Sequence, residues 1–347
     1  MISSGGEGAR LSLVTGAAGF IGSHVAKALI DAGHAVIAVD DLSGGFKDNL
    51  PPDGVFVEGS VVDNDFVEGL FGQHPIEYVF HLAAYAAEGL SHYIRRFNYA
   101  NNVLGSVNLI NQAVINDVKR FVFTSSIAVY GENQLPMAED LVPRPGDPYG
   151  IAKYAVELDL EAAKRQFGLE YTIFRPHNVY GEHQNIGDKY RNVVGIFMNQ
   201  IMHEEPMTIF GDGTQTRAFS YIDDVVPVIA GSIDVPEAVG EVFNIGADRP
   251  YSVNELAHVV SATFGVEPEI TYLPARSEVL HAYASHDKVR RFFDLSDETT
   301  PLEVGMGRMA EWARRVGARR TPEFEGIEVW NEFPEGWLGT VEKNDRP

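Results

Sequence analysis

The chain of 347 residues contains no cysteine, no hydrophobic run of membrane length and few positive charges. Without cysteine there is no disulfide, no thiolate metal site and no cysteine nucleophile, which suits a reducing compartment. A membrane helix needs about 20 consecutive apolar residues, and no segment approaches that length. The first ten residues are small and polar, so we expect no signal peptide, no membrane partner and a cytoplasmic location.

Positive charge is scarce enough to leave a formal net charge of −22 at pH 7. A broad nucleic-acid surface or anionic-membrane surface is therefore not expected. The excess negative charge keeps a surface soluble, and it does not exclude an anionic small substrate if a few arginines gather in one site. The 11 histidines show no His-Glu-x-x-His or similar spacing, so we expect no catalytic metal.

The first half of the chain alternates short apolar, β-branched runs with helical segments. The predicted strands are Leu11–Thr15, Ala35–Asp40, Val55–Glu58, Tyr78–Leu82 and Arg120–Ser125, followed later by Tyr171–Pro176 and Val242–Ile245. Helices are predicted between them, for example over Ile21–Ala32 and Asn102–Asn116. This alternation predicts the α/β class, with a doubly wound parallel sheet and helices on both faces.

Beyond Pro176 the pattern becomes irregular, with glycine-rich turns and a shorter helix near Val253–Phe264. We therefore predict a cofactor-binding domain, a smaller C-terminal substrate-binding lobe and a tail. Their ranges are 9–176 with the later strand near 242–246, mainly 177–330, and 331–347. Residues Met1–Gly8 are expected to be disordered, whereas Glu323–Trp337 is apolar enough to dock on the body.

Three glycines follow the first predicted strand, at positions 16, 19 and 22. Gly16 permits a tight turn, Gly19 lets the backbone approach a pyrophosphate, and Gly22 lets helix and strand pack closely. Phosphates would lie at the helix N-terminus, where unpaired N–H groups and the helix dipole favour negative charge. The second strand ends at Asp40, whose carboxylate would bind the adenosine ribose hydroxyls and repel the additional phosphate of NADP. This unit predicts a Rossmann-type NAD site.

A phenol and an ammonium, those of Tyr149 and Lys153, lie four residues apart and hence on one face of a helix. The charge of Lys153, and of an oxidised nicotinamide beside it, would stabilise a phenolate, lower the pKa of Tyr149 and make it a base. This spacing alone is common on solvated helices. Upstream, however, Thr124, Ser125 and Ser126 end a strand, at the edge where open α/β sheets bind ligands.

The glycine loop after Thr15, together with strand-end hydroxyls and a Tyr-x-x-x-Lys pair, resembles the extended short-chain dehydrogenase/reductase family. The resemblance implies that Ser126 hydrogen-bonds the substrate hydroxyl or carbonyl, Tyr149 moves the proton, and Lys153 also holds the nicotinamide ribose. It implies further cofactor contacts at Phe20, Ile21, Asp41, Leu42, Ser43, Leu82, Ala83, Ala84 and Asn101.

The second half resembles the UDP-sugar 4-epimerase branch of that family, which includes UDP-glucose and UDP-glucuronate 4-epimerases. The most specific segment runs from Met207 to Asp224, and Arg175–Gly181 and Asn244–Gly246 continue the pattern. The resemblance implies substrate contacts at Asn178 and Arg217 (phosphates), Phe210 (uracil), Arg276 and Glu278 (phosphate and uridine ribose), and Asn192 before the uracil-contacting turn. Taken alone, either arginine could instead form a surface ion pair.

The neighbours of Ser126 bear on the reaction. Dehydratases and decarboxylases of the family carry acidic residues directly after the strand-end hydroxyl, whereas this chain has Ile127 and Ala128, which cannot transfer a proton. The resemblance therefore favours an isomerase that inverts C4 of a UDP-sugar through a transient 4-keto sugar, with NAD tightly bound and recycled. The alternatives are a nucleotide-sugar oxidoreductase that releases NADH and a non-catalytic NAD-binding protein.

Two features of the sequence leave the identity of the sugar undetermined. A basic residue often seen after the His81-Leu-Ala-Ala turn is missing, and the segment Glu182–Asn192 offers Arg191 near the sugar end. Arg191, with Thr124 and Ser125, could bind the C6 carboxylate of a uronic acid, or it could be one more phosphate or surface arginine. Glucose, glucuronate and N-acetylated hexoses remain candidates. The resemblance also implies a homodimer, for which the predicted helices over 102–116 and 149–166 are candidates.

Overall fold

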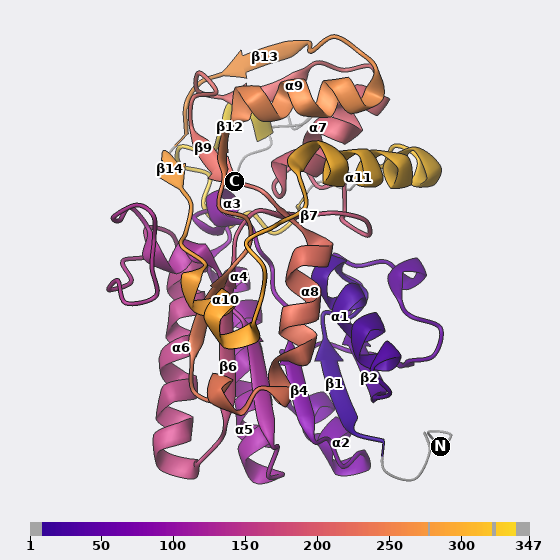
Figure 1. Ribbon diagram of the computed structural model, residues 1–347, viewed down its shortest axis with the longest axis vertical. Helices are drawn as coiled ribbons and strands as arrows, with labels where there is room; N and C mark the ends of the chain where they lie inside the picture. The colour runs from indigo at the N-terminus through magenta and orange to yellow at the C-terminus, as the bar shows by residue number, and fades with distance from the viewer. Residues whose placement is uncertain (1–8, 277, 321–323, 338–347) are drawn as a thin grey trace.

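The computed structural model of the chain describes residues 9–276, 278–320 and 324–337. The first eight residues, for which the sequence predicts disorder, lie outside the described residues. In Figure 1 a large sheet flanked by helices occupies the lower part of the molecule, and a smaller group of helices and short strands lies above it. Among the described residues, no helix is long and apolar enough to cross a bilayer.

The large sheet has seven strands, and every neighbouring pair in it is parallel. The strands are β1 (Leu11–Thr15), β2 (Ala35–Asp40), β3 (Val55–Glu58), β4 (Tyr78–His81), β5 (Arg120–Thr124), β6 (Tyr171–Pro176) and β11 (Val242–Ile245). Their order is β11-β6-β5-β4-β1-β2-β3. The order reverses between β1 and β4, and open α/β sheets bind ligands at the carboxyl ends of strands at such a point. All seven predicted strands are confirmed, although β4 and β5 each end one residue early.

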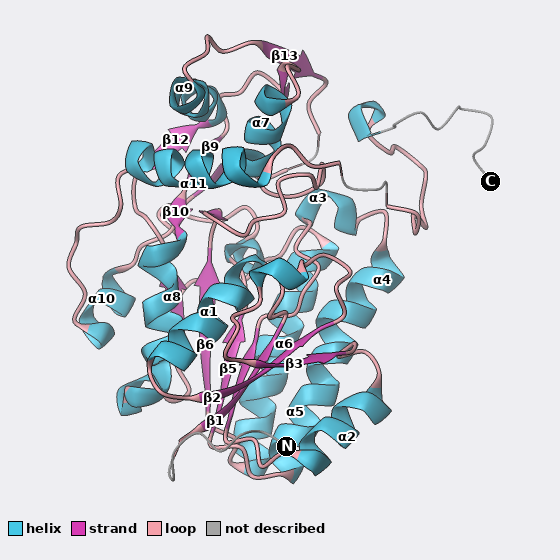
Figure 2. Cartoon of the chain, turned by 90° about the vertical axis from the view of Figure 1, so that its right-hand side faces the viewer, coloured by secondary structure: helices cyan, strands magenta, loops and turns pink. Residues whose placement is uncertain are grey.

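Helices cover both faces of this sheet, as Figure 2 shows. Successive strand side chains point to opposite faces, so Val14 and Phe80 join one core cluster whereas Leu13 and Val79 join the other. The first cluster is covered by α1 (Phe20–Asp31) and α8 (Ile222–Gly231), and the second by α2 (Asn64–Gln73), α5 (Gly105–Ile115) and α6 (Pro148–Phe167). The predicted doubly wound α/β class is therefore confirmed.

The predicted helix over 102–116 is present, but its beginning differs from expectation. Helix α4 (Arg95–Tyr99) continues through a π-helical turn (Ala100–Leu104) into α5. Within this turn the buried Asn102 side chain accepts from the N–H of Tyr85 (3.0 Å) and donates to its carbonyl (3.2 Å). The turn is thereby tied to the segment that follows β4, at the carboxyl edge of the sheet.

The smaller part is built from short elements. Its helices are α7 (Val193–Met202), α9 (Val253–Phe264) and α11 (Leu302–Val316). Its sheets are β12 (Pro250–Ser252), β9 (Thr216–Ala218) and β14 (His281–Ala282) in that order, β13 (Ile270–Leu273) with β8 (Met207–Phe210), and β10 (Ser220–Tyr221) with β7 (Val179–Tyr180). Helix α9 has its predicted bounds because Ser252 and Glu255 form a capping box and Gly265 ends it in the left-handed conformation.

The chain returns to the large sheet after residue 176. Helix α8 packs on α1, and α10 (Asp287–Phe293) packs on β11, the seventh strand of the sheet. The predicted division into 9–176 and 177–330 therefore stays a prediction about function, since the stretch after residue 176 contributes to both parts.

The C-terminal segment, residues 324–337, packs across the body, and we call it the C-terminal strap. Trp337 is buried in an aromatic cluster around α3 (Glu88–Ser91). The Glu328 carboxylate accepts from the N–H groups of Arg96 (2.8 Å) and Phe97 (3.0 Å) at the start of α4. The predicted docking is confirmed for the described part of this segment.

Candidate active site

A cavity of about 680 Å³ lies at the carboxyl edge of the large sheet, where the two parts of the molecule meet. It is lined by residues that follow β1, β2, β4, β5 and β6 and by residues from β8, β9 and the strap. Of the predicted site residues, all of which the structure describes, Leu42 alone does not line it. Leu42 instead has a φ of 61° and donates its N–H to Asp40 (2.8 Å), so it belongs to the turn behind the wall.

The glycine loop of the cavity requires glycine at two positions, because a Cβ there would clash with the backbone. Gly16 has a φ of 70°, and a Cβ there would lie 2.7 Å from the Ala83 nitrogen. A Cβ on Gly22 would lie 2.0 Å from the Gly16 oxygen, so only glycine allows this contact between helix and loop. No described side chain caps α1, and its first turn carries no acidic residue. Its N–H groups are therefore available to an anion.

Asp40 fastens the same loop. Its buried carboxylate accepts from the N–H of Ala18 (3.0 Å) and, through its other oxygen, from Leu42 (2.8 Å). Burial raises the pKa of Asp40 above its ordinary value, and the backbone N–H groups oppose that shift. A carboxylate oxygen can accept two hydrogen bonds. Each oxygen of Asp40 thus keeps one acceptor position, which the predicted ribose contact would use.

Ser126, Tyr149 and Lys153 converge on one wall of the cavity. The hydroxyl of Ser126 lies close enough to the phenol of Tyr149 to act against the rise in its pKa. The ammonium of Lys153 lies 5.8 Å from the centre of the Tyr149 ring and donates to the carbonyl of Thr124 (2.8 Å). Asp147 starts helix α6 by accepting from the Gly150 N–H (2.9 Å), and it thereby orients the face that carries Tyr149 and Lys153.

The pKa values of this group differ from expectation. Burial lowers the pKa of Lys153 to about 7, with the nearby Glu157 opposing the shift. The pKa of Tyr149 is raised, first by burial and next by the negative charge of Glu88. In the chain alone, desolvation of the phenolate thus outweighs any attraction by Lys153, and the expected lowering of the pKa of Tyr149 stays a prediction for the NAD-bound protein. The expectation also counted the charge of a nicotinamide, which the chain does not carry.

A buried polar network lies behind Ser125 and corrects its predicted role. Its hydroxyl donates to Glu157 (2.5 Å), which also accepts from Arg175 through two guanidinium nitrogens (2.9 and 2.5 Å). Arg175 in turn donates to the Tyr130 hydroxyl (2.7 Å), and that hydroxyl donates to Asn244 (2.9 Å). A serine hydroxyl has one proton. Ser125 therefore has none left for a substrate carboxylate.

The hydroxyls of Thr124 and Ser126 keep more hydrogen-bonding capacity for a ligand than that of Ser125. In the described part of the chain, the buried Thr124 Oγ1 has no hydrogen-bond partner, and the residue lines the cavity. The Ser126 Oγ accepts from the Ala128 N–H (3.1 Å) in addition to its contact with Tyr149. A buried hydroxyl without a partner is costly unless a ligand or water supplies one, so Thr124 is a candidate ligand contact.

Arg191 is engaged within the protein. Its guanidinium forms an ion pair with the buried Asp188 (2.6 Å) and lies over the ring of Tyr85, 4.6 Å from the ring centre. Its outer nitrogen also faces Gly44 in the loop after β2, where a Cβ would come within 3.3 Å. The positive charge of Arg191 is thus matched by Asp188 and directed toward the cofactor loop, which weakens its predicted role as the partner of a sugar carboxylate.

The far end of the cavity gathers aromatic rings and arginines. The Arg276 guanidinium lies over Phe210 (4.6 Å) and Trp337 (5.4 Å) and donates to Glu278 (3.1 Å). Arg217 donates to the carbonyls of residues 216, 279 and 280, which leaves part of its donor set for a ligand. The predicted residues Asn178 and Asn192 also line the cavity, both with positive φ (41° and 61°).

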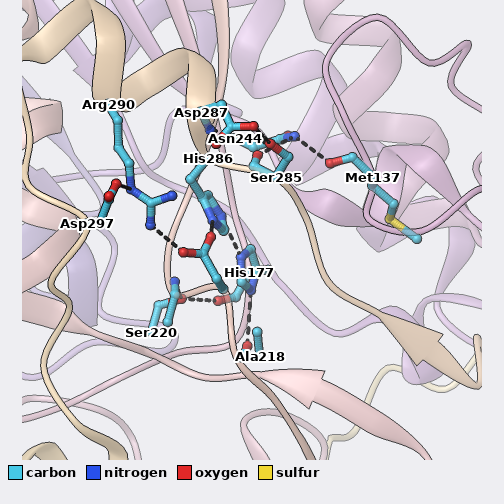
Figure 3. Close-up of polar contacts among 12 residues, drawn as sticks. Met137, His177, Ala218, Ser220, Asn244, Ser285, His286, Asp287, Arg290 and Asp297 are labelled. Atoms are coloured by element: carbon cyan, nitrogen blue, oxygen red, sulfur yellow. Dashed lines mark hydrogen bonds and ion pairs between the residues drawn. The ribbon is translucent and has the colours of Figure 1, made fainter.

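Next to Asn178 a buried pair of histidines joins β6 to α10, and Figure 3 shows the two rings directed at each other. The Nε2 atoms of His177 and His286 are 2.9 Å apart. The outer Nδ1 of His177 meets the Ala218 carbonyl (3.0 Å), and that of His286 meets Asp248 (2.7 Å). Each outer contact needs an N–H, and the inner contact needs one proton. Burial lowers the pKa of His177 to about 3.

Several residues of the site belong to none of the predicted motifs. Glu157 stands four residues after Lys153 on the same face of α6, and that spacing could have revealed it. Asp188 and Trp337 reach the cavity through tertiary packing, and no motif marks them. Glu88 lines the cavity in the segment after His81 where the family's basic residue is missing, so the departure itself was the available indication.

Comparisons with known proteins agree on one family. A model described as the NAD dependent epimerase/dehydratase family matches residues 12–246. A putative UDP-glucose 4-epimerase of Methanocaldococcus jannaschii is 35% identical over 87% of this chain and 98% of its own length. The crystal structure of UDP-glucose 4-epimerase from Thermotoga maritima with UDP-glucose has a TM-score of 0.83 and 37% identity, covering 88% of this chain and 99% of that one. A Bacillus cereus UDP-glucuronic acid 4-epimerase with UDP-glucuronic acid and NAD has a TM-score of 0.80 and 28% identity, covering 88% and 99%.

Proposed function

The chain belongs to the NAD dependent epimerase/dehydratase family, and from this premise we propose that it inverts C4 of a UDP-hexose through a transient 4-keto sugar. It is an isomerase, and NAD is its cofactor. One observation carries the proposal: the Tyr149–Ser126–Lys153 group and the Arg276–Phe210 group line one cavity. A proton-transfer group at one end and an aromatic and cationic group at the other suit a sugar joined to a nucleoside diphosphate.

The residues of the cofactor end fit NAD. The loop has no room for a Cβ at Gly16 or Gly22, the N–H groups of α1 are available, and Asp40 keeps acceptor positions. The chemistry that NAD supplies there is the reversible acceptance of a hydride. In the proposal the phenolate form of Tyr149, which the positive charges of Lys153 and of bound NAD would stabilise, takes the proton of the sugar 4-hydroxyl while Ser126 orients that oxygen. Lys153, with a pKa of about 7, is suited to relaying the proton and to holding the nicotinamide ribose.

The nucleotide end would be held while the hexose turns. Inversion requires the 4-keto sugar to present its other face, so the diphosphate must stay bound during the rotation. In the proposal Arg217 and Arg276 hold the phosphates, Phe210 lies against the uracil and Glu278 accepts from the uridine ribose. The sugar end carries small groups such as Thr124 and Ser126, which leave room for the turn.

Substitution of the phenol tests the assignment. Tyr149→Phe is expected to abolish conversion of UDP-glucose to UDP-galactose while leaving UDP affinity within about twofold, because it removes only the proton-transfer oxygen. Conversion is measured by product chromatography, and UDP affinity by calorimetry. Full activity of the variant would overturn the proposal. Accumulation of NADH by the unaltered enzyme would favour a nucleotide-sugar oxidoreductase. Binding of a UDP-sugar without any turnover would favour a non-catalytic NAD-binding protein.

We also propose that the chain forms a homodimer through α5 and α6. Leu104 and Ile115, at the ends of the α5 region, and Ile151 and Leu158 on α6 are large apolar side chains that are 41–68% exposed. Such groups on adjacent helices suit a four-helix contact between two copies. Leu158→Glu is expected to shift sedimentation from dimer to monomer, and the matched Val266→Glu in the smaller part is expected not to. A dimer unaffected by Leu158→Glu would contradict this interface.

A further inference from the structure

The sugar end of the cavity contains an acidic residue that the family resemblance did not predict. Glu88, the first residue of α3, lines the large cavity, and its side chain is accessible from it. It also lines a smaller adjoining pocket of about 80 Å³, together with Ser126, Asn178 and Arg217. A hexose whose 4-hydroxyl lies at Tyr149 and Ser126 therefore has Glu88 beside it.

When a nucleotide sugar is bound, the charged residues around Glu88 leave a net negative charge at the sugar end of the cavity. Asp147 and Glu278 raise its pKa, while Arg217 and Arg276 lower it. In the proposed function those two arginines are matched by the two charges of the diphosphate. Glu88 and Asp147 then remain as the net charge at the sugar end, and Glu88 is the charged residue that raises the pKa of Tyr149 most.

The groups that a sugar carboxylate would need are committed elsewhere. Arg191 is paired with Asp188 (2.6 Å), and the Ser125 hydroxyl donates to Glu157 (2.5 Å). Of the three residues predicted for a uronate, Thr124 alone keeps a hydroxyl without a partner among the described residues. One neutral hydroxyl does not compensate a carboxylate for the loss of water.

We propose that Glu88 determines the substrate class: its carboxylate accepts hydrogen bonds from the hydroxyls of a neutral hexose and repels a carboxylate at C6. The inference rests on the proposed function, because it assumes that a UDP-sugar binds with its hexose at Tyr149. It selects UDP-hexoses over UDP-hexuronates. Two unit charges about 6 Å apart at an effective dielectric constant near 20 repel enough to change affinity roughly 100-fold.

Calorimetric binding of UDP, UDP-glucose and UDP-glucuronate at pH 8.5 tests this inference, because Glu88 is ionised there. The unaltered protein is expected to bind UDP-glucose roughly 100-fold more tightly than UDP-glucuronate. Glu88→Gln, which keeps the shape and removes the charge, is expected to reduce that ratio at least tenfold by strengthening glucuronate binding. Glu68→Gln, on the exposed face of α2, is the matched control and is expected to leave the ratio unchanged.

A titration of the unaltered protein gives a second readout that needs no variant to fold. Partial desolvation by the cavity walls and the neighbouring carboxylates raise the pKa of Glu88 to about 7, so the ratio is expected to fall as the pH drops from 8.5 to 6. The charged and titratable groups facing Glu88 are Asp147, Tyr149, Arg217, Arg276 and Glu278. Glu278→Gln serves as a comparison, since it should alter UDP affinity itself, whereas Glu88→Gln should not.

Equal affinities for the two sugars, or a ratio unchanged by Glu88→Gln and by pH, would overturn the inference. Because the readout is binding, failure of the proposed function is distinguishable. Discrimination between the sugars without epimerisation would overturn the reaction and keep the role of Glu88. Epimerisation of both sugars with equal affinity would keep the proposed reaction and overturn the role of Glu88. Binding of neither UDP-sugar would overturn both.

Discussion

The two ends of the cavity are built by different means. At the cofactor end the backbone forms the surface: Gly16 and Gly22 pack so closely that a Cβ would lie 2.0–2.7 Å from a backbone atom, and Asp40 holds the turn. At the nucleotide end side chains form it: Arg276 lies over Phe210 and Trp337, and the supporting segments are short strands and the strap. The cofactor end is thus fixed by steric exclusion, and the nucleotide end by contacts that can be changed one at a time.

This difference predicts unequal tolerance to substitution. A change in the backbone-built end should displace the loop and affect cofactor and fold together, since a backbone atom has no rotamer to move into. A change in the side-chain-built end should weaken one ligand by a limited factor.

Gly22→Ala is expected to abolish NAD binding and to lower the free energy of unfolding by about 3 kcal/mol, because the new Cβ meets the Gly16 oxygen. The matched control is Gly72→Ala in α2, where a Cβ meets nothing within 4 Å; it should leave stability unchanged or slightly raised. Denaturant unfolding and the NAD released on denaturation measure both effects. Normal NAD content in Gly22→Ala would break the contrast.

Arg276→Ala is expected to weaken UDP binding about 30-fold while leaving NAD content unchanged, because a charged contact to phosphate contributes about 2 kcal/mol. Arg249→Ala is a control, since this arginine lies over Tyr251 and does not line the cavity. Calorimetry gives the UDP affinity. A simultaneous loss of NAD would mean that the two ends are not independent.

Lys153 lies between the two ends of the cavity, and its ionisation should make the free energy of unfolding depend on pH. Its pKa in the folded state is lowered to about 7, whereas an unfolded lysine titrates near 10.4. Between those values the unfolded chain binds more protons, so the free energy of unfolding should rise with pH, by at most about 1.4 kcal/mol per unit. Lys153→Met should remove that slope. Denaturant unfolding from pH 6.5 to 9.5 measures it, and identical slopes would contradict the lowered pKa.

Trp337→Phe is expected to have the smallest effect, about a threefold loss of UDP affinity, because phenylalanine keeps part of the contact with Arg276 and Phe210. Trp330→Phe is the matched control within the strap, since Trp330 packs on Phe333 but does not line the cavity. Competition with a labelled UDP derivative resolves such a change. An equal loss in both variants would assign the effect to docking of the strap in general.

The same contrast explains what the sequence could predict. The strands, the glycine loop and the Tyr149–Lys153 pair are local patterns, in which spacing along the chain fixes spacing in the fold, and the sequence identifies them. Glu88, Asp188 and Trp337 meet the cavity from segments whose placement depends on tertiary packing. The sequence also could not show that the Ser125 hydroxyl is engaged within the protein, because its acceptor Glu157 lies on a helix 32 positions later.

The histidine pair offers a use beyond support. The proton between His177 and His286 is enclosed on all sides by protein, so its exchange with water should be slow. Such a proton resonates far downfield of the amide envelope, where a proton spectrum of a 38.2 kDa chain is nearly empty. His177 directly precedes Asn178 on the cavity wall. The molecule therefore carries its own spectroscopic probe, whose frequency should shift when a nucleotide sugar arrives, with no label attached.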